Sequence, residues 1–329
     1  MLAYVTGGTG CLGRNLIDVL LQDGWDVVCL HRKSSNIAQL KDYPIRFQEV
    51  DLFDRESVHA AIPNGVDAIF HVAGNVSYWP DPEQWKDNAL ATRNLAHVAL
   101  KRGVKKFIHT STGATLPQQA ISTPERIATI DSGYIRTKRQ AEIELYDVAR
   151  RGLFVVVLHP IIVIGKYDYH GHYSRLFNAK DLRLALPGAL EFCDVEDVAR
   201  AHVTAYHKGR RNEHYVLGGD MLTWFDFLTL VAKVTGAKPP RWVAPSWLLM
   251  IAGYIELARH YLFGHRPEIT PELVRLLSTG ESVQYPEKFK TQTELEYESS
   301  AEAAIRKCHA WMQAERAARD SAAAQQPAS

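Results

Sequence analysis

A tyrosine and a lysine stand four residues apart in this chain, at Tyr134 and Lys138. In a helix this spacing places both side chains on one face. A phenol has an ordinary pKa of about 10, so it exchanges protons poorly at pH 7 unless a neighbouring ammonium group stabilises its phenolate. The pair therefore predicts a helix that presents a proton donor or acceptor, with the lysine lowering the pKa of the tyrosine.

Three hydroxyl side chains come shortly before this pair. Thr110, Ser111 and Thr112 end an apolar run, and Thr112 precedes Tyr134 by 22 positions. Ligands of open α/β sheets bind outside the carboxyl ends of the strands. We therefore expect the hydroxyl cluster and the tyrosine to meet in one crevice. This gives weight to a Tyr–Lys spacing that exposed helices also show by chance.

A glycine-rich loop lies near the start of the chain, with the sequence T-G-G-T-G-C-L-G. Gly7 permits a tight turn, Gly10 lets backbone amides approach a pyrophosphate, and Gly13 allows close packing of the next helix. The helix N-terminus adds partial positive charge. Between a strand and a helix, the loop predicts a dinucleotide site. Its predicted cofactor-binding residues are Gly7, Thr9, Gly10, Cys11, Leu12 and Gly13.

The end of the second apolar run indicates which dinucleotide binds. Proteins that prefer NAD usually place a carboxylate there to accept from the ribose 2′-hydroxyl. Here the chain has His31, Arg32 and Lys33 instead. Arg32 can form two hydrogen bonds to a 2′-phosphate, and its neighbours add positive potential. We expect NADP(H) rather than NAD(H); a solvated basic loop is the alternative.

Two further positions suggest cofactor contacts. Asp51, followed by Leu52, ends the third apolar run and could accept from an adenine amino group. Ala73 and Gly74 follow the fourth run, where small residues would let the ribose and nicotinamide approach the backbone. Turn formation explains either pair equally well.

Alternating strands and helices must position these groups. Six short apolar runs predict strands at 2–5, 26–30, 46–50, 68–72, 106–110 and 153–158, and helical patterns at 12–22, 87–102 and 134–151 lie between them. This alternation predicts an α/β fold with a doubly wound parallel (Rossmann) sheet. After about residue 165 the pattern changes, and helices are predicted at 223–235 and 245–262. We expect a smaller, mostly helical C-terminal substrate lobe.

The expected division of the chain follows from this change. Residues 1–165 and 191–217 are predicted to form the NADP-binding domain, and 166–190 and 218–313 the substrate-binding lobe. The Ala/Gln/Ser-rich residues 314–329 are predicted to form a flexible tail.

Composition limits the partners. The chain has 329 residues, and 38 lysines and arginines against 37 acids give a net charge of +1, which offers no case for nucleic acid. Four dispersed cysteines favour a reducing compartment, and we expect a cytoplasmic protein. His170 and His172 lack recognisable partners, so we predict no metal site and interpret their segment as a mobile substrate loop.

The predicted helix at 245–262 is apolar on nearly all sides, although Glu256, Arg259 and His260 make a membrane span unsuitable. A large apolar substrate, a partner chain or shallow membrane contact could cover it. The acidic residues at 194–197 precede a helical run and are best explained as N-terminal capping.

Taken together, the motifs resemble the extended short-chain dehydrogenase/reductase superfamily. The resemblance rests on the glycine loop, the hydroxyl cluster, the Tyr–Lys pair and the stretch at 194–201, and it covers about residues 1–310. It implies that Tyr134 donates a proton and that Lys138 also binds the nicotinamide ribose. The residue before the small Gly113 is then the catalytic hydroxyl. Here that residue is Thr112, where serine is usual, and Ser111 is the alternative.

Two details refine the resemblance. The stretch H-P-I-I-V-I-G at 159–165 is similar to R-P-x-x-V-x-G of the dihydroflavonol reductase and 3β-hydroxysteroid dehydrogenase-like branch, with His159 in place of arginine and Pro160 assigned to the cofactor site. Asn88 resembles an asparagine that supports the site in this superfamily; a polar residue on a helix face is the alternative.

The leading expectation is an NADPH-dependent oxidoreductase that reduces a ketone or aldehyde of a fairly hydrophobic substrate, or oxidises the corresponding alcohol. A nucleotide-sugar epimerase or dehydratase with retained NAD is the second hypothesis, and a non-catalytic NADP(H) sensor the third. The resemblance also implies a homodimer formed through the helices at 87–102 and 134–151.

Overall fold

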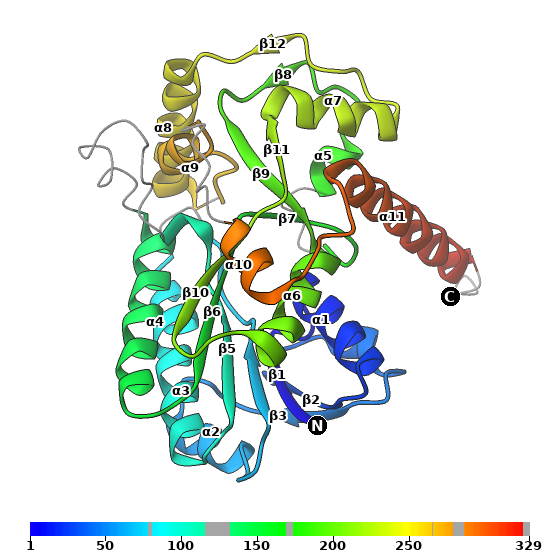
Figure 1. The fold of residues 1–329 in the computed structure, drawn as a ribbon. Helices are drawn as coiled ribbons and strands as arrows, with labels where there is room; N and C mark the ends of the chain where they lie inside the picture. Colours follow the sequence, from blue (N-terminus) through cyan, green and yellow to red (C-terminus); the bar gives the residue numbers. More distant parts are fainter. Residues whose placement is uncertain (78–80, 116–131, 169–173, 265, 279–285, 325–329) are drawn as a thin grey trace.

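A seven-stranded parallel sheet forms the centre of the larger domain (Figure 1). The computed structural model describes all residues except 78–80, 116–131, 169–173, 265, 279–285 and 325–329. The strands lie in the order β10 (Glu213–Leu217), β6 (Val155–Pro160), β5 (Lys106–Thr110), β4 (Ala68–His71), β1 (Leu2–Thr6), β2 (Asp26–His31) and β3 (Arg46–Glu49), and every neighbouring pair is parallel. The predicted doubly wound α/β sheet is confirmed.

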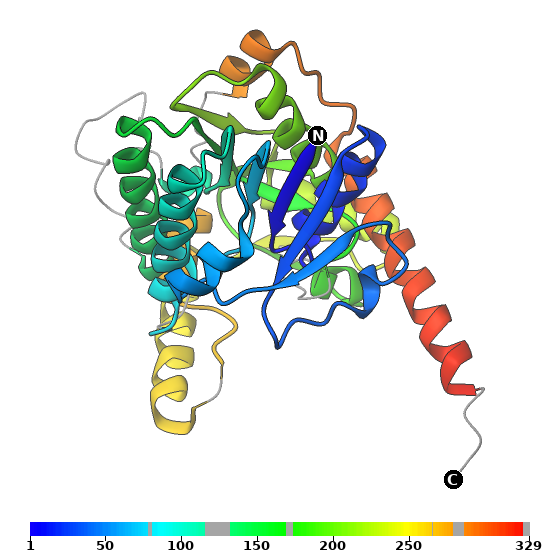
Figure 2. The ribbon, with the colours of Figure 1, turned by 90° about the horizontal axis from the view of Figure 1, so that it is seen from below.

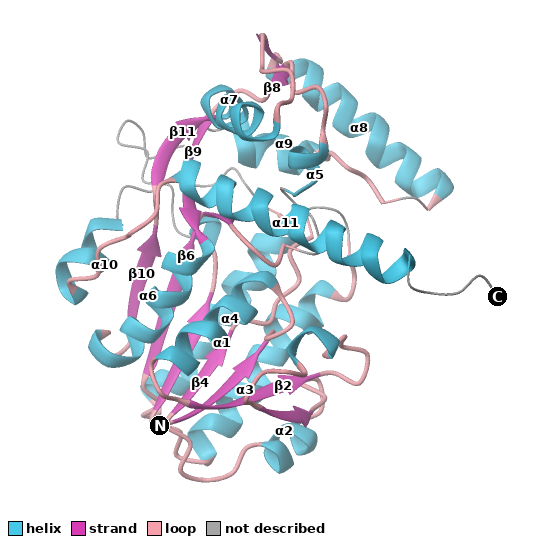
Figure 3. Ribbon diagram, turned by 90° about the vertical axis from the view of Figure 1, so that its right-hand side faces the viewer, coloured by secondary structure: helices cyan, strands magenta, loops and turns pink. Residues whose placement is uncertain are grey.

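Helices cover both faces of this sheet (Figure 3). On one face lie α1 (Cys11–Gln22) and α6 (Val195–Lys208), and on the other lie α2 (Arg55–Ala61), α3 (Ala91–Lys101) and α4 (Gly133–Arg150). Along β1 the side chains alternate between the two cores: Ala3 and Val5 pack towards α1, while Tyr4 packs towards α3. The central strands are buried on both faces and are continuously apolar, which is why the sequence reveals them. The edge strands β3 and β10 are partly exposed and polar, and β10 was not predicted.

The smaller lobe contains more strand than expected. The strands β7 (Ile162–Ile164), β9 (Ala189–Asp194) and β11 (Asp220–Thr223) form a three-stranded sheet, and β8 (Leu184–Ala185) pairs with β12 (Trp242–Val243). The helices of this part are α5 (Ser174–Asn178), α7 (Trp224–Thr235), α8 (Ser246–Phe263), α9 (Pro271–Ser278) and α11 (Ala301–Ala324), while α10 (Pro286–Thr293) packs beside β10. Residues 162–164 and 191–194, which we assigned to the cofactor domain, thus lie in the small sheet.

Helix α6 begins at the junction between the two parts, and an acidic residue caps its N-terminus as predicted. Asp194 is the N-cap of α6, and its side chain accepts from the backbone N–H of Glu196 at 2.8 Å. The same carboxylate lies 2.8 Å from Lys307 Nζ on α11, so this one residue ties the end of β9 to two helices.

Helix α11 continues further than expected. Residues 314–324, assigned from composition to the flexible tail, are helical, and 325–329 lie outside the described residues. Alanine, glutamine, glutamate and arginine are strong helix formers, so the composition that suggested a tail suits a helix equally well.

Helix α8 projects away from the rest of the molecule (yellow in Figure 2). Of its 18 residues only Leu249 and Gly253 are buried, and Tyr261, Leu262 and Phe263 at its end are 69–77% exposed. Among the described helices, none has both the length and the apolarity that a membrane crossing requires.

Stacked aromatic rings fill the hydrophobic core of the smaller lobe, and their loss should reduce its stability. Phe227 is fully buried, and its ring stacks on Phe192 with 4.3 Å between centroids. We expect Phe227→Ala to lower the free energy of unfolding by about 3–5 kcal/mol, because it removes these contacts and leaves a cavity. Phe225→Ala, at a partly exposed neighbouring position, should cost less than about 1 kcal/mol. Urea unfolding of both variants measures the difference, and equal losses would contradict this account of the lobe core.

Candidate active site

The glycine loop lies where the strand order of the sheet reverses. The loop leaves β1, and β4 follows on one side while β2 lies on the other, which is the position where open α/β sheets bind ligands. Gly7 has φ of +72°, and a Cβ atom there would lie 2.7 Å from Ala73 N. A Cβ at Gly13 would lie 2.0 Å from Gly7 O. Both positions therefore require glycine, and the loop contacts the Ala73–Gly74 segment directly.

A chain of buried hydrogen bonds fixes that contact. The Ala73 N–H donates to Thr6 Oγ1 at 3.2 Å, and Thr6 Oγ1 lies 2.8 Å from His71 Nδ1. His71 Nε2 lies 2.8 Å from Thr92 Oγ1, whose single proton goes to Asn88 O at 2.6 Å. Nε2 of the ring must then donate to Thr92 Oγ1. With a neutral ring, Nδ1 accepts from the Thr6 hydroxyl. Burial lowers the pKa of His71 to about 3, in agreement.

Asn88 links the segment after β4 to helix α4. It lies in η2 (Lys86–Leu90), a π-helical turn, and such turns often mark functional sites. Its Oδ1 accepts from Asn75 N at 2.7 Å, and its Nδ2 donates to Asn75 O at 2.9 Å and to Thr137 Oγ1 at 3.0 Å. All polar atoms of the side chain are used, so the supporting position suggested by the sequence agrees with these contacts.

Helix α4 brings Tyr134 and Lys138 to the same edge of the sheet. The helix begins after Ser132, whose side chain accepts from Ile135 N at 2.9 Å. Lys138 is 4% exposed, and its Nζ donates to Thr110 O, at the carboxyl end of β5, at 2.7 Å. A Cβ atom at Gly74 would lie 3.5 Å from this Nζ, so the missing side chain leaves room beside the ammonium.

The pKa values of the pair are set mainly by burial. Burial lowers the pKa of Lys138 to about 8 and raises the pKa of Tyr134 to about 12. The expected lowering of the tyrosine pKa by the lysine is therefore not found. Desolvation of the phenolate outweighs it, and the ammonium is directed at the Thr110 carbonyl. The phenol is protonated at pH 7, as a proton donor must be.

The structure separates the two candidate hydroxyls. Thr112 forms a side-chain hydrogen bond with Tyr134, which favours the phenolate. Ser111 Oγ instead donates to Glu142 Oε1. Thr112 is thus the hydroxyl beside the tyrosine.

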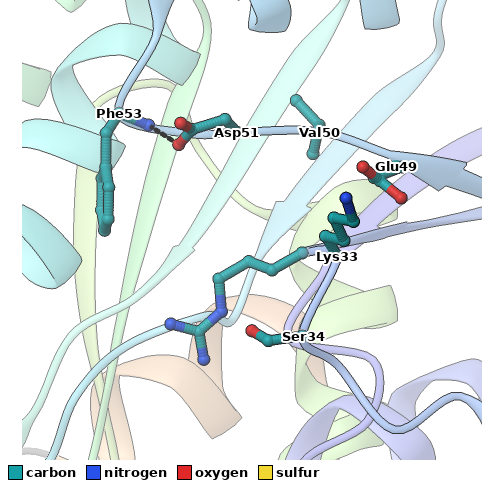
Figure 4. A pocket seen from close by; sticks show the side chains of 7 residues that line it. Lys33, Ser34, Glu49, Val50, Asp51 and Phe53 are labelled. Atoms are coloured by element: carbon teal, nitrogen blue, oxygen red, sulfur yellow. Dashed lines mark hydrogen bonds between the residues drawn. The ribbon is translucent and has the colours of Figure 1, made fainter.

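A surface depression of about 540 Å³ lies beyond the second and third strands (Figure 4). It is lined by Arg32, Lys33, Ser34, Glu49, Val50, Asp51 and Phe53. The basic end of β2 and Asp51, singled out from sequence, thus meet here. Asp51 Oδ1 already accepts from Phe53 N at 2.8 Å, and Arg32 lies 3.6 Å from Asp87, an ion pair that the sequence did not indicate.

The remaining predicted cofactor residues differ in their surroundings. Cys11 Sγ donates to Lys166 O at 3.2 Å, and Leu12 packs against the core beside α1. His31 Nδ1 lies 3.1 Å from Arg32 O, and Leu52 O accepts from Asn94 Nδ2 at 3.0 Å. Thr9 is half-buried, and Pro160 ends β6 near Gly113. His170 and His172 lie outside the described residues.

The residues present fit a dinucleotide. A Cβ atom at Gly7 or Gly13 would collide with backbone atoms, so glycine keeps the loop packed tightly at the N-terminus of α1. The depression that contains Arg32 and Lys33 lies beyond the ends of β2 and β3. Gly74, Lys138 and Tyr134 lie at the other strand ends. A dinucleotide that binds along the carboxyl edge of the sheet would extend from the depression beyond β2, past the glycine loop, to Gly74 and Lys138.

Comparison with known proteins agrees with this geometry. The model of the NAD-dependent epimerase/dehydratase family matches residues 3–218. The chain belongs to this family.

Relatives within the family are of similar length. Sterol demethylase protein B of Methylococcus capsulatus is 30% identical over 85% of this chain and 89% of its own. A putative dihydroflavonol 4-reductase of Synechocystis is 28% identical over 83% and 84%. The resemblance to the dihydroflavonol reductase and 3β-hydroxysteroid dehydrogenase-like branch of the extended short-chain dehydrogenases/reductases is confirmed.

Solved structures show the same fold. The structure of gox2253 has a TM-score of 0.79 and 26% identity, with 95% of this chain and 98% of that chain covered. A UDP-glucose 4-epimerase of Thermotoga maritima has a TM-score of 0.74 at 22% identity, covering 96% and 100%. Members of the family use nicotinamide cofactors, and this protein is an NAD(P)-dependent enzyme of the same class.

The buried lysine makes stability depend on pH. An ordinary lysine has a pKa of 10.5 and Lys138 one of about 8, so between these values the unfolded chain holds a proton that the folded chain lacks. The free energy of unfolding due to this group therefore rises with pH, by up to about 1.4 kcal/mol per unit. Relative to Lys138→Met, the wild type should gain stability between about pH 8 and pH 10. Urea unfolding measures the gap. For Lys101→Met, at an exposed site, the difference in free energy of unfolding from wild type should not change with pH in this way.

The free energy of unfolding of wild type minus that of Lys138→Met should therefore rise between about pH 8 and pH 10. A difference that stays constant or falls over this range would contradict the burial of the ammonium.

Proposed function

We propose that this protein is an NADPH-dependent carbonyl reductase, or the corresponding alcohol dehydrogenase, acting on a fairly hydrophobic substrate. The hydrogen bond by which Thr112 acts on the pKa of Tyr134 is the main support for the proposal, because a protonated phenol and a second hydroxyl then lie together at the carboxyl edge of the sheet. Relatives named as dihydroflavonol reductase, cinnamoyl-CoA reductase, ketoreductase and 3β-hydroxysteroid dehydrogenase support a carbonyl or its alcohol as the reacting group.

In the proposed reaction, side chains of the protein supply the proton that the carbonyl oxygen receives. When bound, the nicotinamide cofactor supplies or accepts the hydride. Tyr134 donates its phenolic proton to the carbonyl oxygen as negative charge develops there, and Thr112 donates a hydrogen bond to the same oxygen. Lys138, one helical turn further along α4, is held by the Thr110 carbonyl and would bind the nicotinamide ribose. In the oxidative direction the same groups remove the alcohol proton.

Replacement of the phenol tests the function directly. We expect Tyr134→Phe to lower kcat for carbonyl reduction by about 10²- to 10⁴-fold, because it removes only the proton donor. NADPH binding, followed by fluorescence, should be nearly unchanged. Tyr146→Phe, at an exposed tyrosine of the same helix, is the matched control. Unchanged turnover in Tyr134→Phe would overturn the assignment of Tyr134 as proton donor. Tightly retained NAD in place of exchangeable NADPH would overturn the proposal in favour of the epimerase alternative.

The two hydroxyls should contribute unequally. Thr112→Ala removes a donor to the developing negative charge and should lower kcat by about 10²- to 10³-fold, whereas Thr112→Ser should retain most of the rate. Ser111→Ala should have a much smaller effect, because Ser111 donates to Glu142. Steady-state kinetics of the three variants measures the order. The reverse order would assign the catalytic role to Ser111.

We propose NADPH as the preferred cofactor because Arg32 and Lys33 line the depression beyond β2. Arg32→Ala should raise the Kd of NADPH at least about tenfold, because it removes charge-assisted hydrogen bonds to the 2′-phosphate. The Kd of NADH should change little. Arg55→Ala, an exposed arginine outside this depression, is the control. Equal weakening of both cofactors would contradict a 2′-phosphate contact.

We also propose that the substrate is hydrophobic and that the protein forms a homodimer. The lobe that would hold the substrate has an aromatic core and carries α8, whose exposed apolar side chains suit a hydrophobic substrate or shallow membrane contact. Ile143 and Tyr146 on α4 are 60% and 67% exposed. They are apolar groups that a homodimer through α3 and α4 would cover.

A further inference from the structure

Five polar side chains that the proposed reaction does not use lie in hydrogen-bonding contact next to Thr112. They are Ser111, Thr115, Glu142, His159 and His214, and we call them the Glu142 cluster. They come from four parts of the fold: the segment after β5, helix α4, and strands β6 and β10.

Glu142 is the acceptor at the centre of the cluster. Its Oε1 accepts from Ser111 Oγ and from Thr115 Oγ1, the latter at 2.8 Å. His159 Nδ1 lies 3.8 Å from the same oxygen. The carboxylate thus determines where the Ser111 hydroxyl points.

His159 holds the backbone of Thr112. Its Nδ1 lies 3.1 Å from Thr112 O, a carbonyl that can only accept, so Nδ1 carries the proton. Burial lowers the pKa of His159 to about 4, so the ring is neutral at pH 7 and its Nε2 accepts from His214 Nδ1 at 2.9 Å.

Ligand-type atoms of Glu142, His159 and His214 lie within 4.8 Å of one another, as a metal site would also require. Both nitrogens of His159, however, already have protein partners on different sides of the ring. We therefore interpret the cluster as a hydrogen-bond network.

The Thr112 carbonyl is anchored more than once. Besides His159 Nδ1, it accepts from Thr115 N at 3.2 Å and lies 2.9 Å from Thr115 Oγ1. Glu142 and His159 therefore both act on the short turn that presents the Thr112 side chain to Tyr134.

We propose, resting on the function proposed above, that Glu142 is a positioning residue of the active site. It holds Ser111 away from the substrate, fixes the turn that presents Thr112, and places one negative charge near Tyr134 and Lys138. Tyr134, Lys138 and Glu142 follow one another at four-residue intervals on α4, so a single helix face carries the proton donor, the ammonium and this carboxylate.

The charge of Glu142 acts on both members of the catalytic pair, raising the pKa of Tyr134 and that of Lys138. The other titratable groups that Lys138 acts on are His71 on β4, His109 on β5 and His159 on β6. His214 on β10 faces Glu142 and His159. Burial lowers the pKa of each, so they are neutral at pH 7. Lys288 and Glu213 act on His214 from beyond the cluster.

Removal of the charge should therefore shift the reaction to lower pH. Eight residues of helix span about 12 Å. At that distance, and at an effective dielectric constant near 20, one charge changes a pKa by up to about one unit. Loss of Glu142 should lower the pKa of Tyr134 by up to this amount.

The decisive variant is Glu142→Gln, which keeps the size of the side chain. We expect kcat for reduction to fall about tenfold because the Thr112 turn loosens, with the KM for NADPH unchanged. The alkaline limb of the pH profile should move to lower pH. Glu144→Gln, on the same helix with its carboxylate paired to Arg93, is the control. Glu142→Asp retains the charge with a shorter reach, so it should lose rate without shifting the limb.

A double variant separates the two effects. In a Thr112→Ala background, and at a pH below the alkaline limb, Glu142→Gln should lower kcat no further, because its effect on the turn acts through Thr112. The shift of the pH limb should persist, because the charge acts on Tyr134 directly.

A spectroscopic readout does not depend on turnover. With 3-fluorotyrosine incorporated, the ¹⁹F signal of residue 134 is assigned by its loss in Tyr134→Phe, and its titration midpoint should be lower in Glu142→Gln than in wild type. If no carbonyl is reduced but this shift is found, the proposed function fails and the inference stands. An unchanged midpoint together with unchanged kcat would overturn the inference. So would one equivalent of bound Zn²⁺ that His214→Ala abolishes, since the histidines would then be ligands.

Discussion

The active site depends on the burial of one ammonium group. Lys138 is almost fully enclosed, and its Nζ donates to the carbonyl of Thr110, which is available because β5 ends there. Burying an isolated charge is costly, so its surroundings must offset that cost. The surroundings supply the strand-end carbonyl, the charge of Glu142 on the same helix, and histidines that remain neutral.

Neutral histidines at several strand ends serve the same requirement. A charged ring at His71 or His159 would repel the ammonium, and in both cases the ring is held neutral while it joins backbone segments. His71 connects the segment around Thr6 and Ala73 to α3 through Thr92, and His159 connects the Thr112 turn to β10 through His214. Side chains thus join β10 and the carboxyl ends of β6 and β5 on one side of the sheet, and the carboxyl ends of β4 and β1 at its centre.

Local sequence patterns were sufficient to predict much of the fold and part of the candidate site. Buried strands are continuously apolar, the glycine loop needs its own residues, and a four-residue spacing defines a helix face, so the sheet, the loop and the Tyr–Lys pair were predicted. His71, Thr92 and Glu142 were missed because their importance lies in partners 65, 21 and 31 residues away. The choice between Thr112 and Ser111 depended on the same distant carboxylate. The strands of the small sheet were missed because β7 has only three residues and because β9 and β11 contain charged residues, so that they form no continuous apolar run.

The attachment of α8 has an evolutionary consequence. The helix is held by a narrow strip, where a Cβ on Gly253 would lie 2.8 Å from Pro271 N, and the lobe beneath it packs around aromatic residues of its own. Mutations elsewhere on α8 disturb neither that contact nor the cores that flank the cofactor sheet. Under the proposed function, substitutions on α8 can therefore change which substrate is accepted, while the helix face that carries Tyr134 and Lys138 is left as it is.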